Sequence, residues 1–325
     1  MTASRLFSLP IGARLAGAAL LCHSAVVSSA QTLPLPPDDV DVVGQVQVIK
    51  ALHEDTLLDI ARRYHLGHDE IVIANPEVDR WMPGEGAAVT LPTRYILPDA
   101  ERAGLVLNIP EMRLYYYPKA KKGEPRVVKT YPVSVGRMDW STPLGKTHIQ
   151  SKQKDPAWRP PASIRAEAAA RGEPLPEIVP PGPKNPLGQY ALRLGVPGYL
   201  IHGTDKPWGI GMRVTHGCMR LYPEDSETVF KEVAVGTQVQ LVNQPVKVGW
   251  VEDTLYMEVH PPLEEDIARK NSLMNIALDV LEQALQQRRV SVSGQAIREA
   301  VERQSGMPVP ISSNATNTSL EASVR

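Results

Sequence analysis

The chain has 325 residues, of which 42% are hydrophobic, and its formal net charge at pH 7 is −1. This length suffices for two domains and an appendage, and the apolar content can fill ordinary cores. Because there is no excess of basic residues, the composition argues against a nucleic-acid-binding protein, and an anionic polymer would have to be recognised by local contacts.

Residues 1–30 predict a signal peptide. Arg5 and Arg14 flank the start of a small-residue apolar run, Leu15 to Val27, and Ser28-Ser29-Ala30 fits a signal-peptidase cleavage site. The apolar run is shorter than the roughly 20 residues that a membrane-spanning helix needs. We therefore expect an exported protein with no integral membrane segment after cleavage.

Cleavage before Gln31 would remove Cys22 and leave Cys218 as the only cysteine. No disulfide could then form within the chain, and an unpaired thiol in an oxidising compartment is a liability unless it is buried or used. The cysteine count therefore supports a catalytic Cys218, although a buried inert thiol satisfies the same count.

Residues 31–45 are rich in Pro and Asp and predict an exposed lead-in segment. A compact unit, residues 46–93, follows. Its first predicted helix is capped by Thr56 and carries Leu57, Ile60, Ala61 and Tyr64 on one face. A second helix runs from Asp69 to Ile73 and stops at Asn75-Pro76, and a strand from Ala87 to Leu91 follows.

This unit resembles a LysM module. The residues that carry the resemblance are Asp55-Thr56-Leu57, Ile60-Ala61, Tyr64, Ala74-Asn75-Pro76, Pro83-Gly84 and Leu91-Pro92. The resemblance implies a peptidoglycan-binding module that contacts the N-acetylglucosamine of glycan strands. The alternative is a degenerate module that only packs against the following domain.

From Gly104 the apolar period changes to two, which predicts a mainly β domain over residues 104–245, an antiparallel sandwich or open barrel. Its predicted strands are Leu105–Ile109, Met112–Tyr117, Arg126–Gly136, Lys146–Lys152, Tyr190–Leu194, Tyr199–His202 and Thr237–Asn243. Within it, residues 155–186 hold nine prolines and a helical patch, Ile164 to Arg171. Such a segment is either a lid over the site or a surface crossover, and the pattern leaves both open.

Helical periodicity dominates the C-terminal part. Helices from Leu263 to Arg289 and from Gly294 to Gln304 predict a helical appendage over residues 250–305, whose apolar stripes pack against the main domain or each other. Residues 306–325 are rich in Ser, Asn and Thr and predict a disordered tail.

Two short segments, Tyr199 to Thr204 and Arg213 to Leu221, bring together residue types that suit acyl transfer. Cys218 is the candidate nucleophile, because a thiolate attacks carbonyl carbon well. His202 and His216 are candidate bases. Taken singly, a buried cysteine or a lone histidine is more often structural.

Gly217 favours the catalytic interpretation over the structural one, because it permits a tight turn just before Cys218. Such a turn can leave amide N–H groups free to stabilise an oxyanion.

The motif has two halves, His202-Gly203-Thr204 and Thr215 to Leu221, and twelve residues separate Gly203 from His216. This order and spacing are similar to the signature of the L,D-transpeptidase (YkuD-type) catalytic domain. Arginine at position 220 resembles the Gram-negative periplasmic branch. The resemblance implies these roles: Cys218 as nucleophile, His202 as its proton acceptor and donor, His216, Gly217 and the Cys218 N–H at the oxyanion site, and Arg220, Thr215 and Gly203 in substrate binding, with Arg220 on a carboxylate.

The implied reaction takes place in the periplasm and needs no cofactor. A peptidoglycan tetrapeptide stem acylates the cysteine, D-alanine leaves, and the acyl group passes to an amine. That amine belongs to another stem, which gives a 3→3 crosslink, or to a lysine of an outer-membrane lipoprotein. Water as acceptor makes the protein a carboxypeptidase or hydrolase, and the motif does not choose among the three.

Three other classes of function remain as alternatives. His202, His216 and Cys218 are all zinc-ligand types, although no familiar short-spaced ligand pair accompanies them. A purely wall-binding protein would use only the LysM-like unit. A cysteine peptidase of the papain type is disfavoured, because there the cysteine precedes the histidine, whereas here His202 precedes Cys218.

Overall fold

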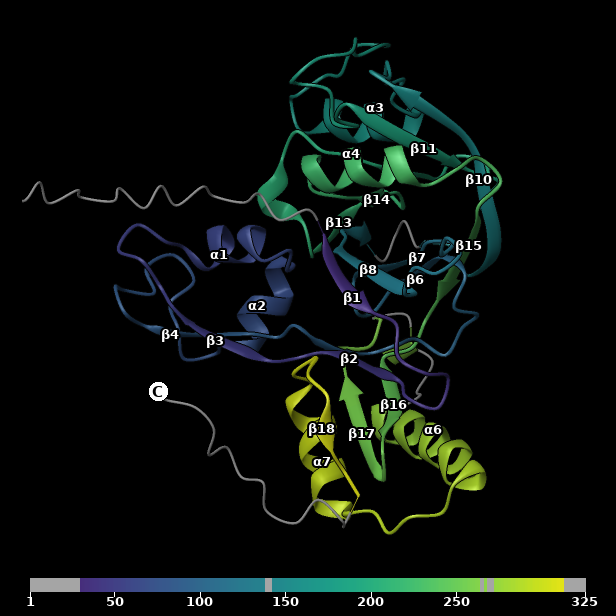
Figure 1. The fold of residues 1–325 in the computed structure, drawn as a ribbon. Helices are drawn as coiled ribbons and strands as arrows, with labels where there is room; N and C mark the ends of the chain where they lie inside the picture. Colours follow the sequence, from purple (N-terminus) through teal and green to yellow (C-terminus); the bar gives the residue numbers. More distant parts are fainter. Residues whose placement is uncertain (1–29, 138–141, 264–265, 268–271, 313–325) are drawn as a thin grey trace, which may run out of the picture.

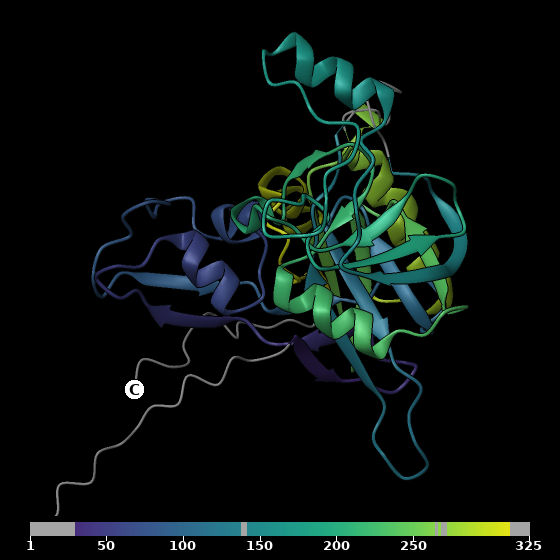
Figure 2. The same cartoon turned by 90° about the horizontal axis from the view of Figure 1, so that it is seen from above.

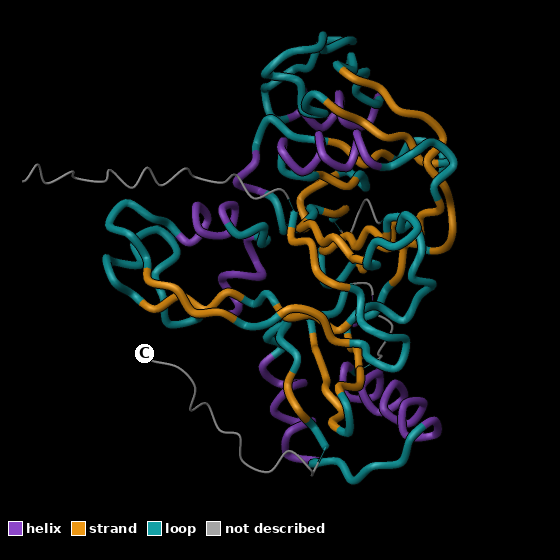
Figure 3. Tube along the Cα trace, in the orientation of Figure 1, coloured by secondary structure: helices purple, strands orange, loops and turns teal. Residues whose placement is uncertain are grey.

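The computed structural model describes residues 30–137, 142–263, 266–267 and 272–312. A central body carries an N-terminal module on one side and a C-terminal domain below it (Figure 1). Strands run through the central body, and helices lie mostly at the margins (Figure 3). The predicted signal peptide lies outside the described residues except for Ala30. Among the described helices, none has the length and apolar character needed to span a membrane.

The central body is a curled, nine-stranded sheet, which confirms the mainly β fold expected from the sequence. The strand order is β1-β8-β7-β6-β15-β10-β11-β12-β14. Neighbouring strands are antiparallel except in two pairs, β6 with β15 and β12 with β14. The strands are β1 (Gln31–Pro34), β6 (Gly104–Asn108), β7 (Arg113–Tyr117), β8 (Val127–Pro132), β10 (Gly145–Lys154), β11 (Tyr190–Leu194), β12 (Leu200–His202), β14 (Met219–Arg220) and β15 (Gln238–Val242).

Both faces of the sheet are covered, so its strands alternate between two cores. Leu105, Leu107 and Leu114 enter a large core that also contains residues flanking the predicted catalytic motif. Val106 and Tyr115 enter a second, smaller core. Alternation of this kind follows from the two-residue period of a strand.

The predicted strand from Arg126 to Gly136 is two strands. β8 ends at Pro132, which has no N–H with which to continue a ladder. The chain then forms β9 (Val135–Gly136), which pairs in parallel with β13 (Arg213–Thr215), just before the predicted nucleophile.

The N-terminal segment is not the exposed lead-in that its composition predicts. β1 pairs with β8 at the edge of the sheet, and β2 (Val42–Gly44) pairs with β5 (Arg94–Ile96). Val42 and Val43 are buried. The prediction was wrong because short apolar runs lie between prolines and aspartates that dominate the composition.

The N-terminal module forms the elements that the sequence predicts. α1 (Leu57–Arg63) begins with a capping box in which Thr56 and Asp59 satisfy each other's backbone amides. The other elements are α2 (His68–Ala74), β3 (Gln47–Lys50) and β4 (Ala88–Leu91), the two strands being antiparallel.

The C-terminal domain is not purely helical. It contains an antiparallel hairpin, β16 (Val246–Val251) with β17 (Thr254–Val259), to which β18 (Val309–Pro310) adds a third strand. Two helices, α6 (Leu273–Gln287) and α7 (Gly294–Arg303), share an apolar core with this sheet. The hairpin was not predicted, because the strong helical period of the residues that follow it dominates this region of the sequence.

Part of the tail predicted to be disordered is therefore ordered, since β18 lies within it; residues 313–325 lie outside the described residues. Of the helix predicted from Leu263 to Arg289, the described part is α6 together with residues 266–267, which are also helical; residues 264–265 and 268–271 lie outside the described residues. Ser272 caps α6 by accepting a hydrogen bond from the Asn275 N–H at 3.2 Å.

Two further helices belong to the central body. α3 (Ala162–Ala170) occupies the proline-rich segment, as predicted, and stands out from the body (Figure 2). α4 (Pro223–Glu232) follows β14 and lies against β11.

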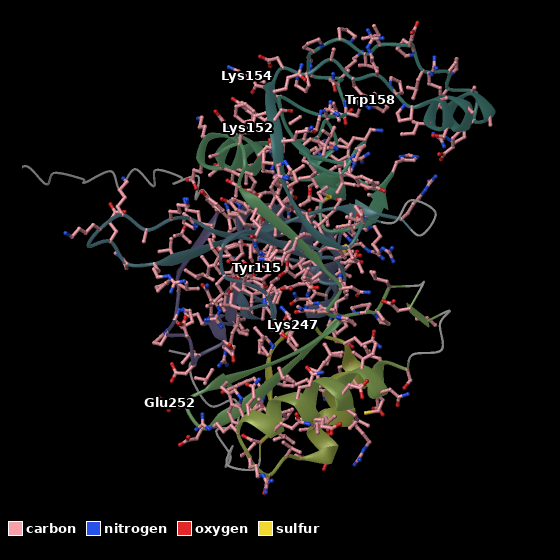
Figure 4. All side chains as sticks on the ribbon, turned by 90° about the vertical axis from the view of Figure 1, so that its right-hand side faces the viewer. Tyr115, Lys152, Lys154, Trp158, Lys247 and Glu252 are labelled. Carbon is pink, nitrogen blue, oxygen red and sulfur yellow. The ribbon has the colours of Figure 1, made fainter. Side chains whose placement is uncertain are left out.

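A buried charge network joins the central body to the C-terminal domain. Lys247 on β16 places its Nζ 2.7 Å from Glu111 and 2.7 Å from Glu258, and all three side chains are at most 2% exposed. Tyr115 donates its hydroxyl to Glu111. Figure 4 shows Lys247 and Tyr115 at this junction. Burial raises the pKa of Glu111, but the charges of Lys247 and His260 and the hydrogen bonds from Lys247 and Tyr115 outweigh it, so the pKa lies below its usual range.

We expect Lys247→Met to lower the free energy of unfolding by about 3–5 kcal/mol, because Glu111 and Glu258 lose the cation that compensates their burial. Urea denaturation measures this. The control is Lys146→Met, whose exposed pair with Glu101 spans 3.7 Å, and which should change stability by at most about 0.5 kcal/mol. Equal effects of the two substitutions would contradict the role of Lys247 as the cation that compensates the buried Glu111 and Glu258.

Candidate active site

The two predicted motif segments meet through the parallel pairing of β12 with β14. Ile201 lies opposite Met219, and His202 lies opposite Arg220. Cys218 immediately precedes β14, so its backbone lies beside the start of β12. The structure thus brings the predicted nucleophile and the predicted base onto adjacent strands.

His202 is 3% exposed, and its ring is fixed by backbone carbonyls. Nδ1 lies 2.6 Å from the Gly203 carbonyl oxygen. A carbonyl only accepts, so Nδ1 carries a proton and, in the neutral ring, Nε2 is the acceptor. Burial lowers the pKa of His202 to about 3 and the Arg220 charge acts in the same direction, while hydrogen bonds to Gly203 and Leu187 oppose both. The imidazole is therefore neutral at pH 7.

Cys218 is partly buried, and its thiol lies 3.6 Å from the Gly198 carbonyl oxygen. Burial raises the pKa of the Cys218 thiol, and a hydrogen bond from the Leu200 backbone and the charges of Arg220 and Arg193 offset this only partly. The resting state is a thiol beside a neutral imidazole. Among the described residues, the hydrogen bond of the thiol goes to the Gly198 carbonyl oxygen.

The turn before the nucleophile has the geometry that glycine permits. Gly217 has φ +96°, a conformation that side chains with a Cβ rarely adopt. Two threonines fix the turn: Thr215 donates its hydroxyl to the Cys218 carbonyl at 2.6 Å, and Thr142 donates to the Gly217 carbonyl at 3.1 Å. Because both carbonyls are occupied, the backbone of Gly217 and Cys218 is held in one orientation.

Gly203 packs closely against α4. A Cβ at this position would lie 2.9 Å from the Ser226 hydroxyl oxygen, so a larger residue would push β12 away from the helix.

His216 makes a contact that the sequence did not indicate. Its Nε2 lies 2.9 Å from Glu167 on α3, and the same carboxylate accepts two 3.0 Å hydrogen bonds from Arg137. Hydrogen bonds from His216, Arg137 and Arg171 lower the pKa of Glu167 to about 2. The proline-rich segment is thereby anchored two residues from Cys218.

Arg220 lies on β14 opposite His202, and its charge acts on Cys218. Burial lowers the pKa of Arg220, although the carboxylate of Asp205 opposes this. Its Nε is buried and has no hydrogen-bond partner in the described structure. Arg193, whose charge also acts on Cys218, was not predicted.

The residues missed by sequence reasoning are Arg137, Thr142, Glu167 and Arg193. Thr142 begins a Thr-Pro-Leu-Gly stretch, whose composition is typical of a turn and does not indicate a role in the site. The others contact the motif across large sequence separations, 49 residues for Glu167 with His216, and no local pattern marks them.

The predicted zinc alternative is not matched by the geometry. Among the described residues, the group close enough to share an ion is Glu111, Glu258 and His260, not His202, His216 and Cys218. That group lies at the domain junction, where Lys247 already provides the compensating positive charge.

Comparison with known proteins adds an independent line of support. Residues 102–242 match the family described as L,D-transpeptidase catalytic domain, and residues 245–311 match the L,D-transpeptidase C-terminal domain. The second match corrects the predicted appendage, since this region is a family domain.

Two relatives come from Escherichia coli K12. The chain is 41% identical to "Probable L,D-transpeptidase YbiS" over 87% of this chain and 92% of the relative, and 38% identical to "Probable L,D-transpeptidase YcfS" over 88% and 90%. A solved structure, L,D-transpeptidase 3 from Mycobacterium tuberculosis, matches 48% of this chain and 67% of its own at 20% identity, with a TM-score of 0.31.

The raised thiol pKa predicts slow, pH-dependent alkylation of Cys218. In a chain that begins at Gln31, Cys218 is the only cysteine, so iodoacetamide labelling followed by mass spectrometry reports on it alone. Thiolate is the reactive form, so the rate should rise with pH through a midpoint above the ordinary value of about 8.5. A midpoint below 7 would instead indicate a thiolate–imidazolium pair.

We expect Glu167→Ala to release α3 from the motif, because it removes the carboxylate shared by His216 and Arg137. Hydrogen exchange of the amides of residues 162–170 should become about three- to ten-fold faster while the rest of the chain is unchanged. Glu173→Ala, an exposed glutamate just after α3, is the matched control. Unchanged protection in the Glu167 variant would show that other contacts hold the segment.

Proposed function

Because this chain belongs to the L,D-transpeptidase family, we propose that it is a peptidoglycan transpeptidase in which Cys218 carries the acyl group. The observation that supports this most directly is a neutral His202 whose Nδ1 is committed to the Gly203 carbonyl. Nε2 is then the only ring atom that can take a proton.

The first step is attack by the Cys218 sulfur on the amide carbonyl of a donor stem. On substrate binding the thiol exchanges the Gly198 carbonyl for Nε2 of His202, which takes the proton as the sulfur–carbon bond forms; catalytic hydrogen bonds often form only in the complex. The backbone N–H groups of Gly217 and Cys218, held by Thr215 and Thr142, stabilise the oxyanion.

The second step reverses the proton transfer. The protonated His202 gives its proton to the departing amine as the carbon–nitrogen bond breaks, which leaves a thioester on Cys218. His202 then takes a proton from the incoming amine, which attacks the thioester, and the thiol is restored.

The donor is a tetrapeptide stem that loses D-alanine, as the family implies. Arg220 suits recognition of its carboxylate, because the guanidinium Nε is buried without a partner and such a group gains from an anion. The acceptor is a second stem, a lipoprotein lysine or water.

The proline-rich segment is proposed to act as a lid. Glu167 connects α3 to His216, and Trp158 lies in the same segment beside α3 (Figure 4). A lid anchored at the motif excludes water from the thioester, which would favour an amine acceptor over hydrolysis.

The N-terminal module is proposed to bind glycan strands in the periplasm after signal cleavage. Leu52, Trp81 and Met82 are exposed by 52%, 59% and 80%. They lie on the two loops that join the module's helices to its strands, where an aromatic ring and apolar side chains would contact a sugar face.

The direct test is mass spectrometry of residues 31–325 with a disaccharide tetrapeptide, with and without a second stem. We expect a thioester adduct and a crosslinked product lacking one D-alanine. Cys218→Ala should form neither, and His202→Ala should slow acylation by about 10²–10⁴-fold.

Circular dichroism of each variant controls for folding. A trimmed tripeptide alone would identify a hydrolase under these conditions. The absence of adduct and product from folded, reduced wild type would overturn the catalytic proposal in favour of wall binding alone.

A further inference from the structure

The loop between α1 and α2 of the N-terminal module, together with the first turn of α2, is packed against the catalytic segment. His68 donates its N–H to the Ile210 carbonyl at 2.8 Å, and Asp69 donates to the Gly211 carbonyl at 3.3 Å. Both acceptors belong to the connection between His202 and Cys218. The module therefore contacts the segment that delivers the nucleophile, upstream of Cys218.

The same loop also contacts the chain downstream of Cys218. Tyr222 donates its hydroxyl to the Leu66 carbonyl at 3.0 Å, and Nδ1 of His65 lies 2.9 Å from Asp225. His65, Leu66 and Asp225 are all buried. Along the chain, Cys218 thus lies between two segments that both contact residues 65–69 of the N-terminal module.

The upstream contact is a close approach of two backbones. A Cβ on Gly67 would lie 2.8 Å from Cα of Gly211, and a Cβ on Gly211 would lie 2.3 Å from Cα of Gly67. Real Cβ atoms do not approach so closely, so one chain would have to shift. Gly67 has φ −83°, which any residue adopts, so steric contact and not backbone strain makes glycine necessary there.

A cavity adjoins this contact. It has a volume of about 460 Å³ and is lined by Gly67 and Glu70 of the module, Gly211 and Met212 of the catalytic segment, and residues of the C-terminal domain. Residues 211–212 therefore border open space, so a shift of this segment need not disrupt a packed core.

The module itself cannot easily move instead. Arg113, fully buried on β7, donates to Glu70 of α2, to the Thr130 hydroxyl at 2.6 Å and to the His65 carbonyl at 3.4 Å. Burial raises the pKa of Glu70 although Arg113 opposes this. This network fixes α2 relative to the sheet.

We propose that Gly67 is a positioning residue for acyl transfer, through which the N-terminal module sets the position of the loop that carries Cys218. The inference rests on the proposed function of Cys218. It makes the module part of the catalytic apparatus, because a misplacement of about 1 Å at a reacting atom can cost about 10²-fold in rate.

The test is Gly67→Ala in the full chain from Gln31. We expect kcat for acylation by the tetrapeptide to fall at least about ten-fold, while KM changes less than about three-fold and the melting temperature stays close to that of wild type. Hydrogen exchange should increase at residues 210–214. The matched control is Gly209→Ala in the same connection, where a Cβ meets no atom within 4 Å, and which should keep wild-type kcat.

A folded Gly67→Ala variant with wild-type kcat and KM would overturn the proposal. If that variant does not fold, Tyr222→Phe tests the module's other contact with the catalytic segment, because it removes the hydrogen bond to the Leu66 carbonyl. A reduced kcat supports positioning of the Cys218 loop by the module, and an unchanged kcat contradicts it. An inactive wild type would refute the proposed function itself, so the two failures are distinguishable.

Discussion

The parallel pairing of β12 with β14 places His202 and Cys218 on neighbouring strands, and the rest of the site depends on it. Parallel neighbours cannot be joined by a tight turn; they need a crossover of about a dozen residues or more. The connection from Gly203 to Cys218 is that crossover. The fixed spacing between the two halves of the motif is therefore a topological requirement, and Gly203, Gly217 and Thr215 shape a loop that must leave one strand and return beside it.

The sequence predicted those parts of the structure whose signals are local. The capping box at Thr56, the alternation along β6 and β7 and the two halves of the motif each lie within a few residues. The hairpin β16–β17 was hidden by the stronger helical period that follows it. Lys247 and Glu111 are 136 residues apart. Such a contact cannot be predicted from a short stretch of sequence, because it depends on how the folded elements pack.

The three parts of the molecule are joined by polar groups, whereas each has an apolar core of its own. Arg113 connects the N-terminal module to the sheet, and Lys247 connects the sheet to the C-terminal domain. A buried charge contributes little net stability but strongly penalises arrangements that leave it unpaired. Such junctions specify one relative placement of the parts, which an apolar interface of similar size would specify less sharply.

The protonated state of Cys218 would matter in the periplasm, where we propose that the protein acts, because that compartment is oxidising. Oxidation to sulfenic acid and the irreversible higher acids proceeds from the thiolate, and so does exchange with foreign disulfides. A sulfur that gives up its proton only when substrate is bound is shielded from both reactions while the enzyme waits. If Cys218 is the nucleophile that we propose, the partial burial that raises its pKa would preserve the thiol in an oxidising environment, and His202 would restore its nucleophilicity only during acyl transfer.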